Sequence, residues 1–113
     1  MTIDDDTKRR SRRVKLDVFL NKIVDEEPFM CRATDISLDG IYLSSLIEPR
    51  FDGKEVSLEF SLPGHEEVIW ARGEIVRDGF RGGASGSGIR FKVMPDQFRE
   101  MIAEYIEQSE EEV

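Results

Sequence analysis

Five cationic side chains stand within the six residues 8–13, whose sequence is KRRSRR: Lys8, Arg9, Arg10, Arg12 and Arg13. A guanidinium group can donate two parallel hydrogen bonds to a phosphate or to O6 and N7 of guanine, and it can stack on a base. Like charges at this density repel one another unless water screens them or an anion binds them. The segment is therefore either a solvated basic run or an anion-binding arm.

A second polar stretch, DISLDG at residues 35–40, offers complementary chemistry. Asp35 and Ser37 are two residues apart, so in a strand they would share a face. An ionised carboxylate suits the adjacent N1–H and N2–H donors of guanine, and a serine hydroxyl suits a phosphate or a sugar. Gly40 permits a positive φ and a close approach of a ligand to the backbone. Without a ligand, the same residues would form a side-chain-capped turn between two strands.

Other residues with reactive or ligating side chains have simpler explanations. The Gly-rich stretch 78–88 lacks the Lys-Ser/Thr ending of a phosphate-binding loop and fits a mobile hairpin loop. His65 has no nucleophile partner in view, and no carboxylate pair is singled out, so we expect no catalytic residue and no enzyme. Cys31 is the single cysteine, which together with one histidine cannot complete a zinc site. We expect Cys31 to fill space in a strand, and we expect no metal and no cofactor.

Trp70 lies in a predicted strand, where it can stack on a guanine or pack in the core or at its rim. Arg72, Arg77 and Arg90 alternate with apolar residues in the last predicted strands. Each of these arginines is either a further phosphate ligand or part of a solvated strand face.

The chain of 113 residues is acidic, with a formal net charge of −8 and 35% charged residues. Its length and composition predict one folded domain. Outside residues 8–13 the charge is more negative still, which disfavours binding of a nucleic-acid polymer but not of a small anion. No apolar run approaches the roughly 18 residues of a membrane span, and the polar start is unlike a signal peptide. We therefore expect a cytoplasmic protein that does not insert into membranes.

Hydrophobic periodicity predicts the elements that hold these residues. Six segments are typical of strands, most clearly the fourth, in which apolar and polar residues alternate: 14–24, 29–37, 41–46, 54–62, 67–77 and 89–93. Residues 95–108 change to steps of three and four, which indicates a helix with one apolar stripe. The pattern predicts a mainly β fold, a six-stranded antiparallel barrel whose C-terminal helix covers one opening or packs on a partner.

These predictions divide the chain into three parts. Residues 1–7 are expected to be a disordered start, residues 8–108 the domain, and residues 109–113 a solvated acidic tail. Within the domain, 8–13 would form the arm, 14–93 the barrel and 95–108 the helix.

The order of these motifs resembles the PilZ family over nearly the whole chain. That family opens with Arg-x-x-x-Arg, matched by Arg9 and Arg13, and continues with Asp/Asn-x-Ser-x-x-Gly, matched by Asp35, Ser37 and Gly40. Its last strands are often similar to ARGEIVR and GIRF, which stand here at 71–77 and 88–91, and a helix commonly follows.

PilZ domains are six-stranded antiparallel barrels that bind the bacterial second messenger cyclic di-GMP. The resemblance implies that Arg9 and Arg13 hold its phosphates and guanine Hoogsteen edges, while the barrel presents Asp35, Ser37 and Gly40. It also gives secondary candidates. Lys8 occupies the position said to influence how many ligand molecules stack. Arg10 or Arg12 would contribute if the register of the arginine motif along the arm is shifted. Trp70 would stack on a base.

The expected function is that of a cyclic di-GMP receptor whose arm becomes ordered on the ligand and exposes a surface to an effector protein. By family analogy, the expected effector belongs to the motility or envelope machinery. The expected partners are the dinucleotide and this effector, with the chain itself a monomer or weak dimer. One alternative is a protein–protein adaptor of the same fold that does not need the ligand. Another is a barrel that binds single-stranded nucleic acid, which the acidic charge disfavours.

Overall fold

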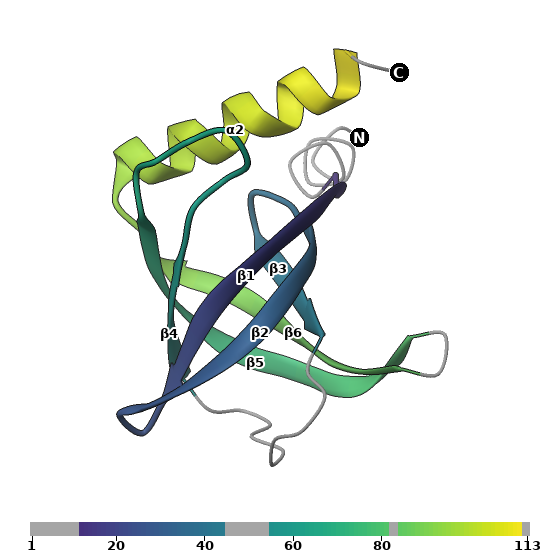
Figure 1. The fold of residues 1–113 in the computed structure, drawn as a ribbon, viewed down its shortest axis with the longest axis vertical. Coiled ribbons are helices and arrows are strands. Elements are labelled where there is room, and N and C mark those ends of the chain that lie inside the picture. The colour runs from purple at the N-terminus through teal and green to yellow at the C-terminus, as the bar shows by residue number, and fades with distance from the viewer. Residues whose placement is uncertain (1–11, 45–54, 82–83, 112–113) are drawn as a thin grey trace, which may run out of the picture.

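The computed structural model describes residues 12–44, 55–81 and 84–111, and the side chains of these residues except 77–87 and 110–111. Within these residues the chain forms six strands and one helix (Figure 1). The elements are β1 (Val14–Val24), β2 (Glu27–Ile36), β3 (Gly40–Ser44), β4 (Glu55–Phe60), β5 (Ile69–Arg81), β6 (Ala84–Val93) and α2 (Asp96–Glu111).

The strands form a closed barrel in the order β1-β2-β3-β6-β5-β4, with every neighbouring pair antiparallel. The predicted mainly β fold, a six-stranded antiparallel barrel with a C-terminal helix, is confirmed. Closure leaves none of the described strands with a free edge.

The barrel interior is filled by the alternating apolar side chains that the sequence pattern indicated. In β4, Val56, Leu58 and Phe60 are buried, while the side chains between them face outward. Cys31 is buried in the same core, as predicted. Lys22 is the exception, because it occupies an inward position of β1 and is 0% exposed.

Helix α2 lies across one end of the barrel (Figure 1). Its apolar stripe, including Phe98, Ile102 and Ile106, belongs to the same buried cluster as the strands. The Tyr105 hydroxyl donates a hydrogen bond of 3.0 Å to the Lys15 carbonyl at the start of β1. The helix was predicted either to cover one opening of the barrel or to pack on a partner, and in the structure it covers one end of its own barrel.

The hairpin at 78–88 differs from the sequence prediction. A mobile loop was expected, but β5 continues to Arg81 and β6 begins at Ala84, with backbone pairs such as Gly79 with Gly86. The apolar alternation of the sequence ends before the pairing does, because backbone hydrogen bonds between strands do not require apolar side chains.

The turn between β1 and β2 is shorter than the sequence predicted. The residues DEEP (25–28) were expected to break the strands, but β2 already begins at Glu27. The turn is formed by Asp25 and Glu26, with φ values of 52° and 69°. Two positive φ values are the signature of a type I′ turn, which joins antiparallel strands through only two residues.

Candidate functional site

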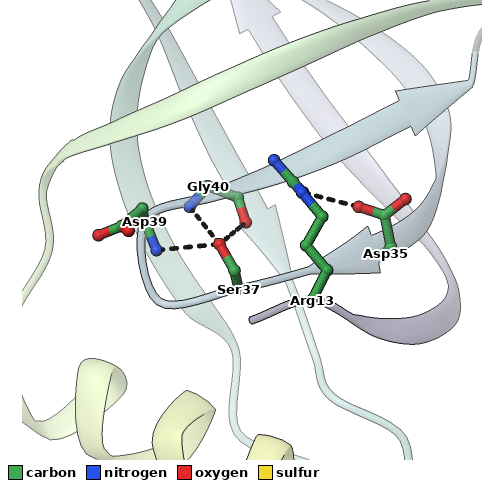
Figure 2. A network of polar contacts seen from close by, with 5 residues as sticks. All are labelled: Arg13, Asp35, Ser37, Asp39 and Gly40. Carbon is green, nitrogen blue, oxygen red and sulfur yellow. Dashed lines mark hydrogen bonds and ion pairs between the residues drawn. The ribbon is translucent and has the colours of Figure 1, made fainter. Parts of the chain in front are cut away.

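An ion pair joins the end of the basic arm to the DISLDG stretch. Nη1 of Arg13, directly before β1, lies 2.7 Å from Oδ1 of Asp35, near the end of β2 (Figure 2). The β2–β3 register shifts between Ala33 and Asp35, and such an irregularity can re-aim a side chain. The structure thus brings together two predicted ligand residues that are 22 positions apart in the sequence.

Ser37 organises the turn that follows β2. Its Oγ accepts hydrogen bonds from the N–H groups of Asp39 at 3.1 Å and Gly40 at 3.2 Å (Figure 2). The Ser37 N–H in turn donates to the Gly40 carbonyl at 2.8 Å. The side chain is 1% exposed, so its hydroxyl serves the turn that was the alternative interpretation of this stretch.

Gly40 was expected to permit a positive φ and the close approach of a ligand to the backbone. The first expectation is not met, because Gly64 is the only glycine with a positive φ among the described residues. A Cβ added at Gly40 would instead overlap the carbonyl oxygen of Ile89 on β6. The absence of a side chain lets β3 and β6 approach each other closely at this turn.

Arg13, Ser37 and Gly40, but not Asp35, line an open cavity of about 240 Å³, which we call the turn cavity. Its lining comes from the arm, the turn after β2, and strands β3, β5 and β6: Arg13, Ser37, Asp39, Gly40, Val76, Gly88, Ile89 and Arg90. Arg90 was a sequence-predicted candidate, whereas Asp39, Val76, Gly88 and Ile89 were not predicted. A local motif cannot identify Val76 or Ile89, because barrel closure brings them to the turn.

Two guanidinium groups face the turn cavity, and each contacts one carboxylate. Arg13 contacts Asp35, and Nη2 of Arg90 lies 3.2 Å from Oε1 of Glu74. A guanidinium has five N–H donors. Each of these contacts engages one nitrogen, so donors remain on both arginines for an anion. The cavity therefore brings guanidinium donors together with Asp39 and the Ser37–Gly40 turn.

The other predicted site residues do not line the turn cavity or are not described by the structure. Arg12 is exposed and does not line the turn cavity, while Lys8, Arg9 and Arg10 lie outside the described residues. Trp70 makes an edge-to-face contact with Phe98 of α2, with ring centroids 6.5 Å apart. That contact places Trp70 at the barrel rim, away from the turn cavity. Arg72 lies near Glu55 at 3.7 Å on the outer surface, and the Arg77 side chain is not described.

No group of three or more His, Cys, Asp or Glu side chains that could hold a metal is found within residues 12–44, 55–81 and 84–111. In the same part of the chain, no helix has the length and apolar character needed to cross a membrane.

Several solved structures have the same fold as this chain. One is the PilZ domain of Escherichia coli YcgR with c-di-GMP, with a TM-score of 0.73 and 16% identity over 93% of each chain. Another is Escherichia coli YcgR in complex with c-di-GMP, with a TM-score of 0.76 and 19% identity over 93% of this chain and 47% of that chain. The Bacillus subtilis inhibitor of motility MotI/DgrA is similar as well, with a TM-score of 0.76 and 16% identity over 86% of this chain and 48% of that chain. The chain thus spans about half the length of MotI and of the longer YcgR chain.

No curated protein matches this chain. A family model described as PilZ domain matches residues 7–108, which is most of the sequence. That match includes the arm, the whole barrel and most of α2, and the barrel topology agrees with it. The chain belongs to the PilZ domain family.

Proposed function

We propose that this protein is a receptor for cyclic di-GMP and that the dinucleotide binds at the turn cavity. The observation that supports this proposal most is that Arg13 and the Ser37–Gly40 turn line one cavity, while Asp35 contacts Arg13 beside it. Three similar structures, two of YcgR and one of Borreliella burgdorferi PlzA (TM-score 0.57, 18% identity), contain c-di-GMP.

In this proposal each residue type has a distinct role. Arg13 donates to a phosphate or a guanine Hoogsteen edge, and Asp35 accepts from a guanine Watson–Crick edge. Ser37 holds the turn in shape, and Gly40 keeps the turn close to β6. Arg9 would add a second guanidinium from the arm.

A cavity of about 240 Å³ is smaller than the usual ligand pocket of roughly 300–1,000 Å³. We therefore propose that it binds only part of the dinucleotide and that the arm, including Arg9, covers the remainder. Neutralising the repulsion among the arm cations with two phosphates would favour this closure. The closed arm would then offer a new surface to an effector protein.

Isothermal titration calorimetry with cyclic di-GMP tests the proposal. Arg13→Ala and Asp35→Ala should each weaken binding by about 1–3 kcal/mol, the scale of one bidentate base contact. Arg72→Ala is the matched control, because Arg72 is also an exposed arginine near a carboxylate but does not line the turn cavity. Absence of heat with the unmodified protein, or equal losses in Arg13→Ala and Arg72→Ala, would contradict the proposal.

A further inference from the structure

Three large apolar side chains are exposed together on the outer surface of the barrel. Phe19 is 69% exposed, Met30 68% and Val68 55%. They line a groove of about 340 Å³, together with Asn21 and Glu59. We call this the apolar groove. Clustered exposed apolar residues mark interaction surfaces, since water solvates them poorly.

The strand register explains why these residues meet. Asn21 of β1 pairs with Met30 of β2 on one side and with Glu59 of β4 on the other. Phe19 is two residues before Asn21 and so has the same outward direction. The groove is therefore built mainly on paired strands of a closed barrel, and only Ser61 and Val68 of its lining residues lie outside the strands.

The charge around the apolar groove is negative. Glu59 lies in the groove and forms no ion pair with any residue that the structure describes, while Glu66 and Glu67 directly precede Val68. The nearby Asp17 is different, because Nε of Arg32 contacts its carboxylate at 2.8 Å. The whole chain has a net charge of −8. A complementary partner would bring apolar side chains and a cation.

The fold limits how such a partner can bind. A strand cannot be added to this barrel, because none of the described strands has a free edge. A second copy of the chain would bring Glu59 and its acidic surroundings against their own equivalents in an isologous contact. A helix that presents apolar side chains on one face and a lysine or arginine beside them has neither disadvantage.

We propose that the apolar groove is the docking site for a basic amphipathic helix of a partner protein. Apolar side chains of that helix, one turn apart, pack on Phe19, Met30 and Val68, and a lysine or arginine pairs with Glu59.

The apolar groove and the turn cavity lie on different sides of the molecule. They share no lining residue. In the order β1-β2-β3-β6-β5-β4, β1 and β6 are three steps apart in either direction around the ring, and β1 crosses the front of the barrel in Figure 1 while β6 passes behind it. One molecule can therefore bind a partner and a dinucleotide together. The docking inference does not depend on the proposed ligand.

The test uses a synthetic leucine/lysine helix of about 14 residues, roughly four turns, as the probe. The protein is labelled with ¹³C at its methionine methyl groups. Met30 reports on the groove, while Met94 just before α2 and Met101 within α2 serve as internal comparisons. The Met30 signal should shift on titration while Met94 and Met101 stay unchanged. A peptide of the same composition with a scrambled, non-amphipathic order should leave Met30 unshifted.

Variants then separate a specific site from general attraction to an acidic protein. Phe19→Ser and Glu59→Lys should weaken peptide binding about tenfold or more, as expected for loss of an interface anchor. Val93→Ser is the matched control, since Val93 is also an exposed apolar strand residue and lies outside the groove. Equal loss in Val93→Ser, no shift of Met30, an equal response to the scrambled peptide, or self-association of the free protein through this surface would overturn the inference.

Discussion

At the scale of single residues, the Arg13–Asp35 contact shows how far sequence could define the site. Both residues were predicted as ligand-binding, and the structure joins them at 2.7 Å. Their direct pairing was not predicted, because the motif gives spacing and not geometry. The same limit applies to Val76 and Ile89, which reach the turn cavity only through strand pairing. Whether these residues bind cyclic di-GMP remains a prediction.

Gly40 gives a stability prediction at this scale. Gly40→Ala should lower the free energy of unfolding by about 1–3 kcal/mol, because the new Cβ would overlap the Ile89 carbonyl and force strands apart. Gly88→Ala is the matched control, since its Cβ would meet Val76 at an ordinary 3.7 Å. Urea denaturation measures both variants. An equal effect of the two substitutions would contradict this role of Gly40.

The Asp17–Arg32 pair gives a prediction on pH. The hydrogen bond from Arg32, and then its charge, lower the pKa of Asp17 below the usual 3.8. The folded state therefore binds this proton less readily than the unfolded state, so the pair stabilises the fold above pH 3.8 and that contribution is lost as the pH falls through the lower folded value. Asp17→Asn should show less acid destabilisation than the unmodified protein in thermal melts, and added salt should reduce the difference because both groups are exposed. Identical pH profiles of Asp17→Asn and the unmodified protein would contradict this contribution of the ion pair.

At the scale of elements, strongly periodic segments were predictable and weakly periodic ones were not. Strand β1 was predicted with its observed bounds, Val14–Val24, since apolar residues mark its inward face. The β5–β6 ribbon was missed beyond residue 77 because its small residues have no apolar pattern. Lys22 also breaks the pattern, as a charged residue at an inward position.

The β1–β2 turn gives a prediction on folding stability. Glu26 has a φ of 69°, a conformation that costs a residue with a Cβ roughly 1–2 kcal/mol. Glu26→Gly should therefore raise the free energy of unfolding by about 1 kcal/mol, and the resulting Asp-Gly pair is a preferred type I′ sequence. Glu27→Gly, one residue later inside β2, should instead destabilise by about 0.5–1 kcal/mol. A loss of stability in Glu26→Gly by chemical denaturation would contradict the turn assignment.

Helix α2 connects the two segments that border the turn cavity. Arg99 donates to the Leu38 carbonyl in the turn at 3.2 Å, and Tyr105 donates to the Lys15 carbonyl just after the arm at 3.0 Å. A ligand that shifts either segment would change a hydrogen bond to the helix.

At the scale of the whole molecule, the closed barrel separates two surfaces of different chemistry. The turn cavity presents arginines and a polar turn, while the apolar groove presents Phe19, Met30 and Val68 beside an unpaired Glu59, as judged within the described residues. The basic arm is thus consistent with a local anion site at the turn cavity, and the acidic remainder of the chain is consistent with a surface at the apolar groove that favours cations. Net charge alone could not locate either surface, because it does not record which strands are neighbours.

The most direct test of the proposed receptor is an NMR titration with cyclic di-GMP that follows the Arg13 side-chain Nε–H together with the backbone amides of Asp39 and Gly40. The account predicts that these signals shift together and saturate, while the side-chain signal of Arg72 on the outer surface stays in place. A saturating titration that moves none of the three, or that moves Arg72 as much as Arg13, would contradict it.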